Sequence, residues 1–325
     1  MNDNFLRLLQ SILQTLYATV GLVLFIIDTI GNLFNVILFS RLESLNKLPS
    51  SLFLLASFIG SQIMLITGLV PRVIVGLTGN TSLVNFLLLC KVRTMLKPAS
   101  ATFSMACVCL AAFDRYLYSS LDLRCQRWVT LQQTRLIITI TVILCLVVFS
   151  PYAVLFYTAP VPSSCSIVNP IFIYVQPCLS LIFYNLAPVV ILSIICSLIW
   201  RNLGQQVAFY LRGHIRCYDQ VTPLIIAQMI VILATTFPTV IWLIYTITTQ
   251  NVSKSSLLHA QEAIVSTVFV LPAYCPYSIM FYVYLIVSPV FRRNVKCLVL
   301  GKRRILPEIN TQRIRKSNIA LELRM

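Results

Sequence analysis

An acid, a guanidinium and a phenol stand side by side in the segment AAFDRYL, residues 111–117, directly after a long apolar run. Asp114 and Arg115 carry opposite charges and can pair with each other. At the centre of a membrane helix a charge costs about 2.5–3.5 kcal/mol on insertion scales, so such a pair belongs at the end of a span. From its residues alone, the triplet of Asp114, Arg115 and Tyr116 is either a marker of the membrane interface or a charge pair that opens during function.

Two further cations stand earlier in the same run. Arg93 and Lys97 share one face of a helix because they are one turn apart in the i, i+4 relation. A charge inside a membrane helix is a functional candidate by default, and this pair would suit a carboxylate or another acidic group of a ligand. The alternatives are that Lys97 pairs with Asp28 or Glu262 inside the protein, or that its long side chain reaches out to the lipid interface.

The composition is that of a membrane protein. The chain of 325 residues is 58% hydrophobic and only 10% charged, whereas a soluble protein carries about 25% charged residues. An α-helix needs about 20 apolar residues to cross the hydrocarbon core, and runs of this length lack the alternation of barrel strands. The sequence therefore predicts an all-α bundle of seven transmembrane helices, at residues 16–39, 51–75, 84–110, 136–157, 171–200, 224–246 and 263–287.

The basic residues set the orientation. With the N-terminus outside the cell, most of the 25 Lys and Arg residues fall on the inner face, as the positive-inside rule requires. The net charge of +16 then reflects topology and contact with anionic membrane lipids, and no nucleic acid is needed to explain it. We expect a multi-pass protein of the plasma membrane with an extracellular N-terminus.

Four regions follow from this topology. Residues 1–14 form a short extracellular N-terminus, and residues 15–288 form the transmembrane domain. Residues 289–300 form an amphipathic juxtamembrane helix, and residues 301–325 form a basic cytoplasmic tail that is disordered or bound to lipid. The first apolar run is too long for a removed signal peptide and lacks a clear cleavage site.

The eleven cysteines do not form a disulfide framework. Most of them lie in spans or face the reducing cytosol. Cys90 and Cys165 share the oxidising side, and a bridge between them would pin the loop SSCSIV across the mouth of the bundle. The alternative is two free thiols.

Three positions are candidates for modification. Cys297, beside basic residues just past the last span, is equally a palmitoylation site or a plain interfacial cysteine. Asn80 and Asn251 begin N-glycosylation sequons in predicted outer loops, which agrees with the orientation.

Catalytic, metal and cofactor sites are not indicated. His214 falls in an inner loop and His259 in an outer one, too far apart for one metal ion, and the 9 acidic residues are scattered. We therefore expect no enzyme and no cofactor.

The motifs taken together resemble those of a known family. DRY at the inner end of the third span, Cys90 at its outer start and Cys165 in the next outer loop look like the pattern of a rhodopsin-like (class A) G-protein-coupled receptor. The resemblance covers residues 16–300, nearly the whole chain.

Other positions match the family one by one. Asn32 in GNLFN corresponds to the polar anchor of the first span, and Pro188 and Pro238 correspond to the prolines of the fifth and sixth spans, where they would act as hinges. In the seventh span the family motif reads MFYVY here, which keeps only Tyr284.

The departures cluster in the interior. Gly60 stands where the family has the acidic residue that coordinates sodium, and Met280 and Phe281 replace further polar positions. The chain is therefore similar to divergent invertebrate members of the family, in which neither ion modulation nor ligand class can be carried over.

The resemblance implies a mechanism. Activation would tilt the sixth helix outward and free Arg115 to meet the C-terminal segment of a Gα subunit. Asp219 is a candidate for a resting latch to Arg115. Because amine receptors carry an aspartate where this chain has Lys97, the resemblance argues against an amine ligand.

Three function classes were compared. The receptor, which takes an extracellular ligand such as a short peptide or small molecule and activates a heterotrimeric G protein, accounts for all the motifs. A seven-span transporter or channel would need polar residues that track through several helices, and the midplane offers mainly Asp28 and Lys97. A membrane enzyme would need a cluster of acids or histidines near one face.

Overall fold

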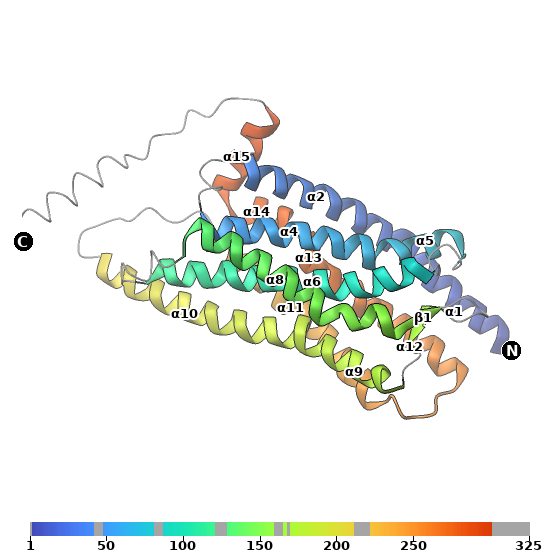
Figure 1. Ribbon diagram of the computed structural model, residues 1–325. Coiled ribbons are helices and arrows are strands. Elements are labelled where there is room, and N and C mark those ends of the chain that lie inside the picture. The colour runs from blue at the N-terminus through green and yellow to red at the C-terminus, as the bar shows by residue number, and fades with distance from the viewer. Residues whose placement is uncertain are drawn as a thin grey trace, which may run out of the picture.

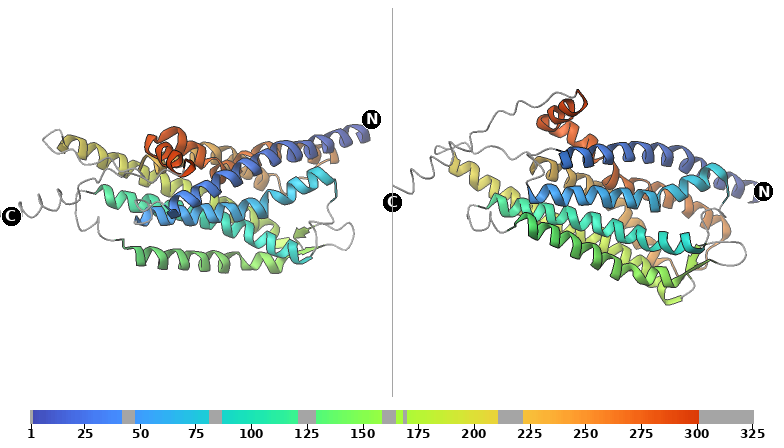
Figure 2. Two further views of the ribbon diagram at one scale, coloured as in Figure 1. Left: turned by 90° about the horizontal axis from the view of Figure 1, so that it is seen from above. Right: turned by 45° about the horizontal axis from the view of Figure 1, so that its top comes forward.

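The protein is an elongated bundle of helices (Figure 1). The computed structural model describes residues 2–41, 48–80, 87–120, 129–158, 165–167, 170–210 and 222–300. Within them, the start of α1 lies at one end of the bundle and α15 at the other, and both views in Figure 2 show this arrangement.

The helices follow one another with short breaks. The first half contains α1 (Asn2–Leu16), the π-helical turn η1 (Tyr17–Gly21), α2 (Leu22–Arg41), α4 (Pro49–Gly68), α5 (Val70–Thr78), α6 (Leu87–Ser119) and α8 (Leu131–Leu155). The second half contains α9 (Pro170–Leu181), the π-helical turn η2 (Ile182–Leu186), α10 (Ala187–Tyr210), α11 (Thr222–Thr248), α12 (Ser256–Val270), the 3₁₀ turn η3 (Pro272–Tyr274), α13 (Cys275–Ser278), α14 (Met280–Val287) and α15 (Pro289–Val299).

A small antiparallel hairpin completes the fold. Strand β1 (Phe156–Thr158) pairs with β2 (Cys165–Ile167), with Phe156 opposite Ile167 and Thr158 opposite Cys165. The hairpin lies at the same end of the bundle as α1, where β1 packs against α6.

Six helices in the described residues are long and apolar enough to cross a membrane. They are Arg7–Arg41, Pro49–Thr78, Leu89–Ser119, Leu131–Val154, Pro223–Thr248 and Ser256–Tyr277. The helical, multi-pass membrane architecture predicted from the sequence is thus confirmed. The predicted span at 171–200 corresponds to α9, η2 and α10, in which Ala187–Asn202 is a shorter apolar helix.

The helices extend beyond the predicted spans. The first helix already begins at Asn2, inside the region 1–14 that was expected to precede the membrane, and α1 packs against α5 and α12. The N-terminal residues therefore form part of the bundle.

Burial separates a central helix from a peripheral one. The helix α6 packs against α4, α8 and α10, and its side chains Ala111 and Ala112 are completely buried. On α8, by contrast, Val147 and Val154 are 63% and 78% exposed. Such an outward apolar surface is unfavourable in water and is what a helix presents to lipid.

Candidate functional site

A cavity of about 350 Å³ lies at the end of the bundle that carries the N-terminal helix. Such a volume is at the small end of the range for ligand sites, about 300–1,000 Å³. Lys97 and Arg93 of α6 line it, as do Arg72 of α5 and Tyr17 of η1, while α1 adds Leu13 and Gln14. The structure therefore places both cations predicted from the sequence in one cavity and adds a third.

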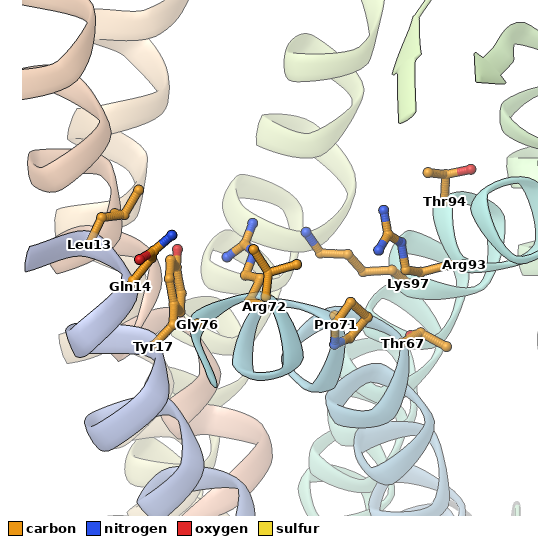
Figure 3. A pocket seen from close by; sticks show the side chains of 12 residues that line it. Leu13, Gln14, Tyr17, Thr67, Pro71, Arg72, Gly76, Arg93, Thr94 and Lys97 are labelled. Atoms are coloured by element: carbon orange, nitrogen blue, oxygen red, sulfur yellow. The ribbon is translucent and has the colours of Figure 1, made fainter. Parts of the chain in front are cut away.

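The three cations converge on the same space. Figure 3 shows the Lys97 side chain extending toward Arg72, with the Arg93 side chain beside Lys97. Like charges at close range repel one another.

One internal partner proposed for Lys97 is wrong. The carboxylate of Glu262 pairs with Lys254, whose Nζ lies 2.7 Å from Oε1, and it also accepts a hydrogen bond of 2.6 Å from the hydroxyl of Tyr245. These contacts join α12 to the end of α11. The other proposed partner, Asp28, is completely buried in α2.

A glycine lets two elements that line the cavity approach each other closely. A Cβ on Gly76 would lie 2.8 Å from the carbonyl oxygen of Gln14 and 2.9 Å from the nitrogen of Ala18. The helix α5 therefore meets α1 and η1 backbone to backbone, which only glycine allows. This contact holds Tyr17 beside Arg72, whose guanidinium carbon is 5.7 Å from the centre of the Tyr17 ring.

A buried hydroxyl lies close to one residue of the cavity wall. Tyr274 is 1% exposed, and its hydroxyl makes no hydrogen bond within the described part of the chain. A Cβ on Gly68, which lines the cavity, would be 3.0 Å from that hydroxyl and 3.5 Å from Cδ of Lys97. Tyr274 is one of several aromatic residues that the sequence predicts either to line the pocket or to pack in the bundle or at the membrane interface.

The sequence did not single out Arg72 as a site residue. It follows Pro71 near the outer end of the second predicted span, where a basic residue is ordinary. Only the packing of α5 against η1 turns its side chain toward Lys97. A signal was present in the sequence, since Arg72 is one of few cations expected on the outer face.

The ion pair predicted in DRY lies at the opposite end of α6. Nη2 of Arg115 is 2.8 Å from Oδ2 of Asp114, and the two residues are 2% and 7% exposed. The same Oδ2 accepts a hydrogen bond of 3.1 Å from the backbone nitrogen of Ser50. Because α4 has no side-chain cap of its own, Asp114 satisfies one of the free N–H groups at the start of that helix.

One tyrosine ring lies beside this pair. The guanidinium carbon of Arg115 lies 5.0 Å from the ring centre of Tyr118. Tyr116 is half-buried and packs against Phe113. The predicted latch residue Asp219 lies outside the described residues.

Tyr284 joins two helices of the core. It is completely buried, and its hydroxyl donates a hydrogen bond of 2.6 Å to Oε1 of Gln228 in α11. Its ring packs against Phe39, Phe58 and Phe291, which belong to α2, α4 and α15. Tyr284 therefore links α14 to the start of α15 and to the helix that carries Pro238.

The predicted hinge prolines lie where helix geometry changes or is weakened. Pro188 directly follows Ala187, the first residue of α10, after the π-helical turn η2. Pro238 lies inside α11. A proline removes one helical hydrogen bond, and π-turns often mark functional bends.

Several interior polar groups are hydrogen-bonded to one another. The amide nitrogen of Asn32 donates to the carbonyl oxygen of Tyr277 at 3.1 Å and to Oε1 of Gln62 at 3.3 Å, as expected of a polar anchor. Oγ of Ser104 lies 2.9 Å from Oγ of Ser57 and from Oγ of Ser61.

The space beside Gly60 is filled. A Cβ at this position would lie 2.8 Å from Cδ1 of Phe103. Among the described residues, no group of three or more His, Cys, Asp or Glu side chains is placed to hold a metal ion.

Cysteines and sequons complete the predicted positions. Cys90 is disulfide-bonded, and the side chain of Cys165 lies outside the described residues, so their pairing stays a prediction. Cys297 is a half-buried free thiol in α15. Asn80 and Asn251 are exposed and follow α5 and α11.

No protein-family model matches the sequence, and a comparison with the curated proteins finds no match.

Proposed function

We propose that this chain is a G-protein-coupled receptor, a divergent member of the rhodopsin-like family. In this proposal the N-terminus is extracellular, the bundle crosses the plasma membrane seven times, and α15 lies on the cytosolic surface among membrane lipids. An extracellular ligand enters the basic cavity, and a heterotrimeric G protein binds the end that carries Asp114 and Arg115.

The observation that carries the proposal is the position of two charged sites on one helix. Lys97 and Arg115 both belong to α6, about 27 Å apart along its axis at 1.5 Å per residue. That distance approaches the thickness of the hydrocarbon core, about 30 Å. One site therefore faces each side of the membrane, as a receptor that carries a signal across it requires.

Arg115 is suited to a switch because its carboxylate partner is its neighbour in the chain. The ion pair holds Arg115 against α6 and, through Ser50, holds α4 in place. A G protein that binds Arg115 in another arrangement would compete with this pair. Coupling follows if the ligand and the G protein prefer the same arrangement of the helices.

The arrangement of the ends supports seven crossings. The first and last helices begin and end on opposite sides of the bundle (Figure 1), as an odd number of crossings requires. The short apolar helix Ala187–Asn202 continues α9 and η2, so the predicted fifth span is helical over residues 170–210.

A transporter or channel is supported less well. Between the two sites the core is filled by apolar side chains such as Leu65, Met105 and Val108. The serines that lie nearby bond to one another. These contacts favour a packed bundle over a solute path.

Nucleotide exchange tests the proposal. Purified receptor in lipid nanodiscs would be mixed with heterotrimeric G proteins, and exchange on Gα measured for the wild type and for Arg115→Ala. We expect the variant to lose exchange because Arg115 is the group that meets Gα. The matched control is Arg135→Ala, which removes an exposed arginine of α8 at the same end of the bundle. Unaltered exchange in Arg115→Ala would contradict the proposed mechanism.

Modifications on the two sides belong to the same proposal. The bridge from Cys90 to Cys165 and the glycans on Asn80 and Asn251 would be extracellular, and a palmitoyl group on Cys297 would be cytosolic. Loss of a glycan mass shift in Asn80→Gln or Asn251→Gln would assign each sequon.

A further inference from the structure

We infer that Tyr245, Lys254 and Glu262 form a regulatory clasp, which holds one half of α11 on α12 and thereby restrains the movement of the whole helix. The inference rests on the proposed function in treating the end of the bundle that carries α1 as the outer end. The restraint itself acts within the chain, so it is measured without a G protein.

The first argument is the bonding of the clasp. Nζ of Lys254 donates to both carboxylate oxygens of Glu262, at 2.7 and 2.9 Å, and the hydroxyl of Tyr245 donates to Oε1 at 2.6 Å. The side chains of Lys254 and Glu262 are only 10% and 17% exposed. An isolated ion pair on a surface contributes little, whereas a largely buried network of charge-assisted hydrogen bonds holds its members more firmly.

The second argument is the position of the three residues in the chain. Tyr245 lies in the last turn of α11, Glu262 lies in the second turn of α12, and Lys254 lies in the connection between the two helices. Nζ of Lys254 also donates to Oγ1 of Thr249 at 2.9 Å and lies 5.2 Å from the ring centre of Tyr245. The clasp therefore joins the end of α11, the connection and the start of α12.

The third argument is the packing of the same half of α11. The ring of Trp242 stacks on that of Phe269 in α12, with the ring centres 5.8 Å apart. Oγ1 of Thr239 lies 3.4 Å from the carbonyl oxygen of Phe269. These contacts and the clasp all lie between Pro238 and the end of α11. The half of the helix that follows Pro238 is thus fixed to α12 as a unit.

The half of α11 that precedes Pro238 is held by an uncharged contact. The hydroxyl of Tyr284 donates to Oε1 of Gln228 at 2.6 Å, and both residues are buried. Since α12 leads through η3 and α13 into α14, both contacts join the sixth predicted span to the seventh. The clasp lies at the end of the bundle, where Tyr245 is 38% exposed. A molecule outside the membrane can therefore reach the clasp.

A displacement of the inner end of α11 has two routes. The helix bends at Pro238 while its outer half stays on α12, or the whole helix tilts and the clasp opens. A closed clasp permits only bending, because tilting would break its charge-assisted bonds. Opening the clasp adds the second route and shifts the equilibrium toward the displaced arrangement.

Fluorine NMR of the purified protein in nanodiscs measures this equilibrium. Trifluoromethyl-phenylalanine in place of Ile226 would report on the inner half of α11, about three turns before Pro238. We expect Glu262→Gln to raise the population of a second resonance, relative to the first, by about fivefold or more. Such a factor is at the lower end of the coupling found between distinct sites.

Further variants assign the effect to the pair of charges. Lys254→Met should shift the resonances as Glu262→Gln does, and combining the two should add little, since both remove the same interaction. Exchanging the charges, with Lys254→Glu and Glu262→Lys together, should return the ratio toward that of the wild type. The control is Lys91→Met, which removes a lysine of α6 at the same end of the bundle and should leave the ratio unchanged.

Two results would overturn the inference. The first is an unchanged or lower ratio in Glu262→Gln and Lys254→Met. This holds even if both variants unfold at a lower temperature, because the ion pair would then stabilise both arrangements equally. The second is a shift in both single variants that the exchanged charges do not reverse, because the effect would then not come from the pair.

Nucleotide exchange in the absence of agonist separates the clasp from the proposed function. We expect exchange on Gα to rise in Glu262→Gln and Lys254→Met by about the same factor as the resonance ratio. Exchange that depends on Arg115, together with unchanged resonances, would overturn the clasp and leave the receptor proposal standing. Shifted resonances without nucleotide exchange in any variant would support the restraint and contradict the receptor proposal.

Discussion

The charged residues at the two ends of α6 have opposite surroundings. At one end Arg115 is almost completely buried and has a carboxylate 2.8 Å away, which also caps α4. At the other end Lys97 faces two arginines in a cavity. A charge beside an opposite charge holds the bundle together, whereas like charges brought close to one another repel.

The largest loss of stability is expected from a substitution in the ion pair. Asp114→Ala removes the carboxylate that pairs with buried Arg115 and the acceptor for Ser50. Removing one partner of a buried pair typically costs about 3–5 kcal/mol. We expect a large drop in the unfolding midpoint in nanodiscs, and a drop no larger than that of Arg135→Ala would contradict this account of the pair.

The next largest loss of stability is expected from a substitution in the cavity wall. In Gly76→Val the added atoms would meet the backbone of Gln14 and Ala18 at 2.8 and 2.9 Å. Overpacking of this kind lowers stability by about 1–3 kcal/mol. It would also move the segment that contains Gln14 and Ala18 away from Arg72.

Gly204→Ala is the control for that substitution. No heavy atom lies within 4 Å of a Cβ at Gly204 in α10, so we expect a gain of about 0.5–1 kcal/mol. Equal effects of the two substitutions on the unfolding midpoint would refute the close backbone approach at Gly76.

Tyr284→Phe tests the core between the two ends. The substitution keeps the ring and leaves Oε1 of buried Gln228 without its donor. We expect a loss of about 1–3 kcal/mol, measured by thermal unfolding. Gln228→Leu should offset part of this loss in the double variant, and strictly additive losses would argue against the hydrogen bond.

The smallest effect is expected from the charge of Lys97 in the cavity. Lys97→Met should raise the stability of the protein by up to about 1 kcal/mol, because it removes repulsion from Arg72 and Arg93. Added sodium chloride should stabilise the wild type more than the variant, since salt screens the repulsion. A stability gain that does not depend on salt would point to apolar packing instead.

The sequence predicted the elements better than the contacts. Apolar runs identify the helices because a membrane allows little else, and the i, i+4 spacing correctly placed Arg93 and Lys97 on one face. Helix ends were less certain, since α1 begins well before the first apolar run.

Contacts between distant segments could not be predicted from one sequence. The backbone nitrogen of Ser50 donates to Asp114, and Glu262 pairs with Lys254 and not with Lys97. Both contacts depend on tertiary packing that no local sequence pattern records. Arg72 was missed for the same reason. Its place beside Lys97 depends on the close approach of α5 to η1 at Gly76.

The central claim is that the basic cavity and the ion pair of α6 face opposite sides of the membrane. A membrane-impermeant maleimide applied to intact cells would test it with two variants, Val252→Cys after α11 and Gln132→Cys at the start of α8, both compared with the wild-type background. The account predicts labelling of Val252→Cys in intact cells and of Gln132→Cys only after permeabilisation. Labelling of both from the same side, or in the reverse order, would contradict it.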